Sequence, residues 1–246
     1  APPEKNGWRD LAFTIEGSLV ARVADWFEQL EQWTRDPHAH FRSIRRRVRA
    51  WNPGTAPVQL LIGGPTIGLS TWSRSVSRDL IHGQRLDMIM AYFAPAYRLR
   101  KRIRRIAVKG HTRLILAGKS DNAATIGASR TLYKKLLRAR AHIYEFQPCK
   151  LHTKVIVLDD TVYIGSANFD MRSLYVNLEI MVRIEDPALA ERMREFVGEH
   201  IPVSLHVTTA IYRQWATPLS RVRWWLSWFL TSVVDYSVSR NINLRL

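Results

Sequence analysis

The sequence has little of three things: cysteine, acidic charge and long apolar runs. Cys149 is the single cysteine among 246 residues, which excludes an internal disulfide framework and a cysteine-cluster metal site. No run of 18 uncharged apolar residues occurs, so the sequence predicts no membrane-spanning helix. The chain has 21 Asp and Glu residues but 37 Lys and Arg residues, which gives a net charge of +16. This surplus indicates an anionic partner and leaves open nucleic acid, an anionic lipid surface or a phosphorylated substrate.

Two basic runs carry much of the surplus, at residues 42–49 and 98–109. Either run by itself is most simply interpreted as the solvated face of a helix. In the second run Leu99, Ile103 and Ile106 recur at helical spacing, which predicts an amphipathic helix with a basic outer face. No RNA-binding signature or zinc-finger spacing accompanies the charge, so the runs do not choose among the anionic partners.

Segments of strand character alternate with segments of helical periodicity between residues 11 and 200. This alternation predicts an α/β fold with a largely parallel or mixed sheet flanked by helices, and no internal repeat is apparent. Ser18 is a candidate N-cap for the first helix, and residues 36–57 are interpreted as a basic, Pro/Gly-rich connection. The expected strands are 11–17, 58–65, 86–95, 112–118, 142–146 and 177–186, and the expected helices are 18–33, 98–109, 129–141 and 187–200.

The C-terminal segment differs in composition from the rest of the chain. It has apolar residues at helical spacing together with several Trp and Arg residues. One interpretation is a helix packed on the core; the other is an interfacial helix, because Trp and Arg are favoured at the level of lipid headgroups. In the second case the candidate membrane-contacting residues are Trp224, Trp225, Trp228, Arg221 and Arg223.

The stretch "HTKVIVLDDTVYIGSAN" (152–168) gathers polar groups around two apolar segments. "VIVL" predicts a strand, and side chains two residues apart share a strand face, so His152 and Lys154 are expected to project together. Asp159 lies seven residues after His152, which places it on the other face. It is therefore expected to hold a turn through backbone N–H groups. Ser166 and Asn168 again share a face.

This set of groups is suited to a phosphate diester. A histidine nitrogen can attack phosphorus and form a covalent intermediate. Lysine and the Asn amide can neutralise the non-bridging oxygens as charge develops. No carboxylate cluster is available for Mg²⁺ or Ca²⁺, so we expect neither a metal nor another cofactor.

The same residues carry a resemblance to a known family. "HTKVIVLD" matches the HxKxxxxD motif of the phospholipase D superfamily, and "GSAN" matches the Gly-Ser-x-Asn that follows it. Over most of residues 8–200 the sequence is similar to bacterial cardiolipin synthases. The similar segments are "WRDLAFTIEGSLV", "YFAP", "LYKKLLRARAHIYEF" and "GSANFDMRSLYVNLEI".

The resemblance implies a phospholipase D-like mixed sheet flanked by helices and a role for each motif residue. His152 is implied to be the phosphoryl-transfer histidine, as either nucleophile or general acid, with Lys154 and Asn168 binding the phosphate and Ser166 assisting. Glu179 matches the carboxylate that orients the histidine through its other ring nitrogen. Asp159 is implied to be structural. Five residues separate it from Gly-Ser where the family usually has six, which leaves open whether Asp159 or Asp160 makes the turn contacts.

A complete site in this superfamily uses two such motifs, yet no other histidine of this chain is followed two residues later by lysine. Either the chain pairs with itself across a two-fold axis, or it is the C-terminal half of a two-motif enzyme. The first residue is Ala rather than Met, which favours the second. We accordingly expect an N-terminal remnant with a basic connection (1–57), a catalytic half-domain (58–205) and a Trp-rich membrane-associating tail (206–246).

Three functions are compatible with these features. The first is a phosphatidyltransferase of cardiolipin synthase type, which passes a phosphatidyl group through a phosphohistidine to phosphatidylglycerol and releases glycerol. It would work peripherally on the cytoplasmic face of a bacterial membrane, held by anionic phospholipid. The second is a homodimeric phosphodiesterase or nuclease, which would explain the positive charge equally well; we expect nucleic acid less than lipid. The third is a non-catalytic basic membrane-binding module with a degenerate half-site.

Overall fold

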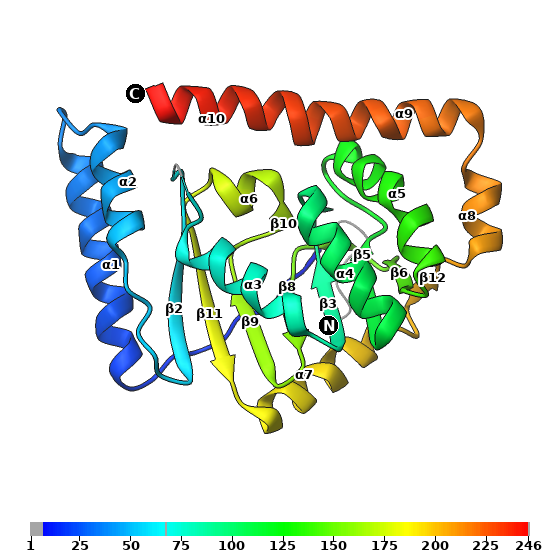
Figure 1. Ribbon diagram of the computed structural model, residues 1–246, viewed down its shortest axis with the longest axis horizontal. Helices are drawn as coiled ribbons and strands as arrows, with labels where there is room; N and C mark the ends of the chain where they lie inside the picture. Colours follow the sequence, from blue (N-terminus) through cyan, green and yellow to red (C-terminus); the bar gives the residue numbers. More distant parts are fainter. Residues whose placement is uncertain (1–6, 67, 246) are drawn as a thin grey trace.

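The computed structural model describes residues 7–66 and 68–245 and places helices on both faces of an eight-stranded sheet (Figure 1). The strand order is β12-β6-β5-β3-β8-β9-β11-β2. Strands β3, β5 and β6 run parallel, whereas the remaining neighbours pair antiparallel. The expected mixed α/β sheet is therefore confirmed. Its strands are β2 (Val58–Gly63), β3 (Arg85–Met90), β5 (His111–Ala117), β6 (His142–Phe146), β8 (Lys154–Leu158), β9 (Thr161–Gly165), β11 (Glu179–Glu185) and β12 (Ser204–His206).

Two short parallel ladders lie outside this sheet. β1 (Trp8–Arg9) pairs with β7 (Lys150–Leu151), and β4 (Phe93–Ala94) pairs with β10 (Phe169–Asp170). The first ladder ties the residues just before His152, and the second ties Phe169–Asp170 just after Asn168, to segments distant in sequence. Together they position both ends of the motif.

One face of the sheet is covered by α3 (Thr71–His82), α4 (Tyr97–Lys109) and α5 (Ala123–Arg138). In α4 the residues Leu99, Ile103 and Ile106 are buried, which confirms the amphipathic helix predicted from their spacing. Burying this apolar stripe stabilises the helix against the sheet, while its arginines and lysines remain at the surface or half-buried.

The other face is covered by α1 (Ser18–Arg35), α2 (Phe41–Ala50) and α7 (Pro187–Glu199). Trp26, Ile44 and Val48 are fully buried in this layer with strand residues of β2, β8 and β9. The predicted boundary at residue 57 therefore does not separate two cores, because α1 and α2 belong to the same core as the sheet. Residues 1–6 and 246 of the predicted terminal units lie outside the described residues.

Three local predictions are wrong. Residues 11–17 form no strand and have no sheet partner in the described part of the chain. Helix α1 begins at Ser18 with Gly17 as its N-cap, at φ 82°, so Ser18 is not the cap. The supposed connection 36–57 contains α2, because its apolar residues at positions 41, 44 and 48 share one helical face despite the surrounding arginines.

The C-terminal segment begins with α8 (Thr209–Trp215) and continues as one long rod. Helix α9 (Pro218–Phe229), a π-helical turn η1 (Leu230–Val234) and α10 (Asp235–Arg245) follow without interruption and cross one end of the molecule, next to α6 (Met171–Tyr175) (Figure 1). Helix α9 packs on α5, where a Cβ atom at Gly127 would lie 2.7 Å from the Ser227 hydroxyl. Among the described residues, no helix combines the length and apolar character that crossing a membrane requires.

Candidate active site

His152 lies in the two-residue gap between β7 and β8, and its backbone is fixed by the N-terminal segment. The N–H groups of His152 and Thr153 both donate to the Arg9 carbonyl, at 2.8 and 3.1 Å. The regular strand begins only at Lys154, so the expectation that His152 belongs to it is wrong. The His152 side chain is 47% exposed, whereas Lys154 is buried. The histidine is thus held at the surface of the site and the lysine beneath it.

The ring nitrogen Nδ1 of His152 lies 2.6 Å from a carboxylate oxygen of Asp10. Trp8 packs edge-on against the imidazole, with ring centroids 5.4 Å apart. Burial raises the pKa of Asp10, but the hydrogen bonds from His152 and the Leu11 N–H, together with the positive charges of His152 and Lys154, outweigh burial and leave this pKa below its ordinary value. A carboxylate accepts hydrogen bonds only, so Nδ1 carries the proton and donates it. The lone pair of a neutral imidazole then resides on Nε2, which is free to act as a nucleophile.

Glu179, which the resemblance assigned to orient the histidine, does not contact it. Glu179 begins β11, and β9 lies between β11 and β8. Its carboxylate accepts hydrogen bonds from the Ser166 hydroxyl and, at 3.3 Å, from the Asn177 amide. The orienting carboxylate on His152 in this chain is Asp10, because the β1–β7 ladder brings that residue across 142 positions of sequence.

A sequence signal for Asp10 was present and was missed. "WRDLAFTIEG" (8–17) and "NLEIMVRIED" (177–186) both place a carboxylate at the third position, follow it with apolar alternation, and close on Ile-Glu. In both cases a helix follows, α1 and α7 respectively. The two segments are therefore related in pattern, and Asp10 occupies the position that corresponds to Glu179.

Lys154 and Asn168 each carry side-chain N–H donors of the kind that a phosphate requires. Burial lowers the pKa of Lys154, against the opposing charges of Asp10, Glu179 and Asp170, and its ammonium donates to the His152 carbonyl. The Asn168 side-chain oxygen accepts the backbone N–H of Tyr92 at 3.2 Å. This contact leaves the Asn168 NH₂ group available as a donor.

Ser166 is held by backbone as well as by Glu179. Its N–H donates to the Ile180 carbonyl, and its hydroxyl accepts from the Ile180 N–H at 3.0 Å. The preceding Gly165 lies so close to β11 that a Cβ atom there would be 2.2 Å from the Ile180 carbonyl oxygen. Glycine is therefore required at this position by close backbone approach. The Ser166 hydroxyl is therefore already engaged by Glu179 and by the backbone of β11.

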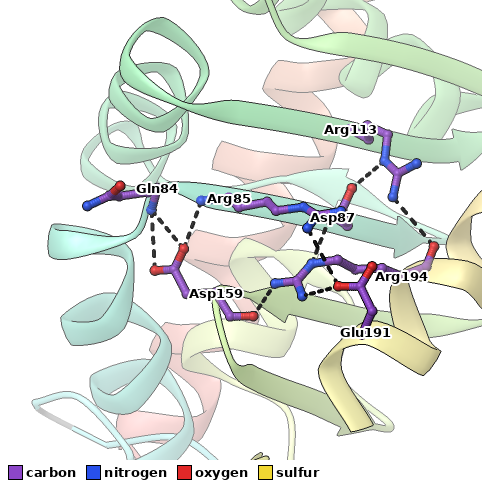
Figure 2. A network of polar contacts seen from close by, with 7 residues as sticks. All are labelled: Gln84, Arg85, Asp87, Arg113, Asp159, Glu191 and Arg194. Atoms are coloured by element: carbon purple, nitrogen blue, oxygen red, sulfur yellow. Dashed lines mark hydrogen bonds and ion pairs between the residues drawn. The ribbon is translucent and has the colours of Figure 1, made fainter. Parts of the chain in front are cut away.

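Asp159 lies in the two-residue turn between β8 and β9, and its carboxylate holds the start of β3 (Figure 2). It accepts the N–H of Gln84 at 3.1 Å and the N–H of Arg85 at 2.8 Å, while its own carbonyl accepts from Arg194. These contacts agree with a structural role, and they bind a neighbouring segment rather than the turn itself. Asp159, and not Asp160, makes them.

The same network contains a fully buried carboxylate, Asp87. It accepts a hydrogen bond from Arg113 and forms an ion pair with Arg194 at 3.4 Å (Figure 2). Arg194 in turn contacts Glu191 at 3.0 Å. The charges on β3, β5 and α7 therefore compensate one another inside the fold and do not take part in the site.

The predicted membrane-contacting residues fall on different faces of α9. Trp224 is buried against Tyr212 and the core, so its assignment as a membrane contact is wrong. Trp228 is half-buried, with the Arg100 guanidinium 5.8 Å from its ring centroid. Trp225 is 51% exposed, and Arg221 and Arg223 are exposed on either side of Trp224. Helical rotation decides this division, because neighbouring residues differ by about 100° around the axis.

Comparison with known proteins agrees with the site. The family model described as "Cardiolipin synthase, PLD-like domain" matches residues 78–200, half of the chain. The chain belongs to this phospholipase D-like family. The major cardiolipin synthase ClsA of Bacillus subtilis is 26% identical over 217 residues, which cover 86% of this chain and 45% of that protein. Cardiolipin synthase 1 of Bacillus cereus is 28% identical over 211 residues, which cover 77% and 39%.

Solved structures show the same fold. Phosphatidylserine synthase from Haemophilus influenzae superposes with a TM-score of 0.61 at 13% identity, covering 81% of this chain and 52% of that one. The phospholipase D family member Nuc from Salmonella typhimurium gives a TM-score of 0.50 at 20% identity, covering 62% of this chain and 98% of that one. The chain spans less than half the length of the curated relatives it matches.

Proposed function

We propose that this chain supplies one half-site of a phosphatidyltransferase of cardiolipin synthase type. The observation that carries the proposal is the contact between Asp10 and Nδ1 of His152, because it leaves Nε2 as a free nucleophile. Lys154 and the Asn168 amide lie in the same motif as donors for a phosphate. Buried cationic donors of this kind stabilise developing charge more strongly than they would in water.

The reaction proceeds in two displacements at phosphorus. His152 Nε2 attacks the phosphatidyl donor, a P–N bond forms, the P–O bond to the departing glycerol breaks, and a general acid protonates the leaving oxygen. A hydroxyl of phosphatidylglycerol then loses its proton to the same group and attacks phosphorus. The P–N bond breaks and its electron pair returns to Nε2.

The acid and base would come from a second motif, in the same polypeptide or in a second copy of the chain. Two features support this part of the proposal. The curated relatives are more than twice as long as the region they share with this chain. Residues 10–16 have strand-like alternation in sequence but belong to no strand of the described region. Phe13 is exposed there, which suits pairing with a complementary half.

Membrane association would use the outer face of α9 and η1. Leu219, Val222, Trp225, Leu226 and Leu230 are all exposed and recur at helical spacing along the rod. The flanking arginines and the net charge of +16 favour an anionic surface. This arrangement supports peripheral binding at the cytoplasmic face of a bacterial membrane.

The test is to trap the covalent intermediate in the full-length protein. Phosphatidylglycerol in mixed micelles is mixed with enzyme, the reaction is quenched in alkali, and peptides are mapped by mass spectrometry. A phosphatidyl adduct on His152 and formation of cardiolipin are expected. Both should be lost in His152→Ala and retained in His38→Ala, which removes an exposed histidine between α1 and α2. Cleavage of single-stranded DNA without any lipid product would reject the proposal in favour of a nuclease.

A further inference from the structure

A cavity of about 220 Å³ opens beside the phosphate-binding end of the motif. Its walls come from β4, the start of α5, the motif segment that contains Asn168 and Asp170, and the rod at η1. This volume is far larger than a single water molecule needs. The cavity therefore lies between Asn168, one of the proposed phosphate ligands, and the C-terminal rod, which none of the motif chemistry uses.

The rod contributes a buried hydroxyl that has no partner. Ser232 is 6% exposed, lines the cavity, and its Oγ makes no hydrogen bond within the described residues. An unsatisfied buried hydroxyl is costly and rare in folded proteins. Ser232 lies in the π-helical turn Leu230–Val234, a local distortion that is common at functional sites. The neighbouring Thr231 hydroxyl, by contrast, is satisfied by the Ser227 carbonyl at 2.9 Å.

The other polar groups of the cavity define what it can hold. Asp170 accepts the Ser173 N–H at 2.9 Å through one oxygen, and Arg172 is paired with Asp235 at 3.2 Å. Two carboxylates against one guanidinium disfavour a phosphate anion inside the cavity. The two carboxylates, the free Ser232 hydroxyl and the Asn168 amide supply the hydrogen-bond acceptors and donors that a ligand with adjacent hydroxyl groups requires.

We propose that this cavity is the polyol subsite for the alcohol acceptor, holding the free hydroxyls of a glycerol headgroup while one hydroxyl attacks phosphorus. The inference rests on the proposed function and adds the substrate position to it. Attack forms the new P–O bond and breaks the P–N bond to His152, as in the second displacement above. Ser232 and Asp170 are positioning residues in this scheme, since they hold hydroxyls that do not react.

The first experiment measures partition of the phosphohistidine between alcohol and water in the full-length protein. Ser232→Ala is compared with Ser237→Ala, which removes an exposed hydroxyl from α10 of the same rod. With free glycerol as acceptor, the ratio of transfer to hydrolysis should fall about tenfold in Ser232→Ala, equivalent to one hydrogen bond of about 1.4 kcal/mol. The melting temperature should stay the same or rise, because an unsatisfied hydroxyl is removed. An unchanged ratio in an active enzyme overturns the subsite and leaves the proposed function standing.

A second experiment does not depend on activity. Saturation-transfer NMR with glycerol should show contact with the wild-type protein and with Ser237→Ala, and a clear loss in Ser232→Ala. Equal signals in all three proteins would overturn the inference even if no lipid is transferred. A stronger signal from ethanolamine than from glycerol would also overturn it, because the carboxylates would then select a cation rather than a polyol.

Discussion

Asp170 offers the sharpest test of the site's electrostatics. It is the N-cap of α6 and lines the cavity beside Asn168. Burial raises its pKa from 3.8 to about 6, and the nearby Glu179 charge adds to the increase, while hydrogen bonds from the Ser173 and Arg172 backbone oppose it. The folded protein therefore holds this proton more tightly than the unfolded chain does.

The sign and size of the effect follow from that difference. With a folded pKa of about 6 against 3.8 unfolded, the folded state is relatively most stable below pH 3.8. Its unfolding free energy falls as pH rises through the interval and levels off above about pH 6. A difference of about 2.2 pKa units at 1.36 kcal/mol each gives a penalty of about 3 kcal/mol above pH 7. Asp170→Asn keeps the N-cap, since Asn and Asp cap equally well, and removes the charge.

The assay is urea unfolding of wild type and Asp170→Asn between pH 4 and pH 8. The difference in unfolding free energy should shift by about 2.4 kcal/mol in favour of the variant across this range, most of it between pH 4 and pH 6.5, because a small part of the full penalty is already present at pH 4. Asp186→Asn is the matched control, because Asp186 caps α7 by accepting the Leu189 N–H at 2.9 Å, away from the cavity. If the difference in unfolding free energy between wild type and Asp170→Asn does not change with pH, then burial does not raise the pKa of Asp170 and the reasoning is refuted.

Four further substitutions have expected outcomes. Asp10→Asn should lower the phosphatidyl transfer rate about a hundredfold, because an amide can donate to Nδ1 and select the wrong tautomer; unaltered initial rates would contradict this role. Asp87→Ala leaves the buried Arg194 without this carboxylate and should lower the unfolding free energy by about 3 kcal/mol in a urea titration. A negligible decrease would show that the network is not needed for stability. Trp224→Ala should cost about 3–5 kcal/mol in the same titration. Trp225→Ala should lower the unfolding free energy little, yet it should weaken flotation with anionic vesicles. If Trp225→Ala destabilises the protein more than Trp224→Ala does, the other face of α9 packs inward.

Much of the fold could be predicted because its elements are coded locally. Strand β6 and helix α7 agree with their predicted ranges to within one residue, and the buried stripe of α4 follows from a spacing of three and four residues. Motif spacing likewise predicts that His152, Lys154 and Asn168 act as one group. Helix α2 escaped prediction because its arginines mask a short apolar face that only packing on the sheet reveals.

The family and the mixed α/β sheet could be predicted, and the motif residues grouped, because each of these depends on residues close together in the chain. The contact of Asp10 with His152, where Glu179 was expected, could not be predicted, because it depends on a long-range ladder between residues 8–9 and 150–151. Tertiary packing also turned Trp224 inward and Trp225 outward and enclosed Ser232 beside Asn168. Local periodicity predicts which residues share a face of a helix or strand. The partner against which that face packs depends on contacts between segments distant in sequence.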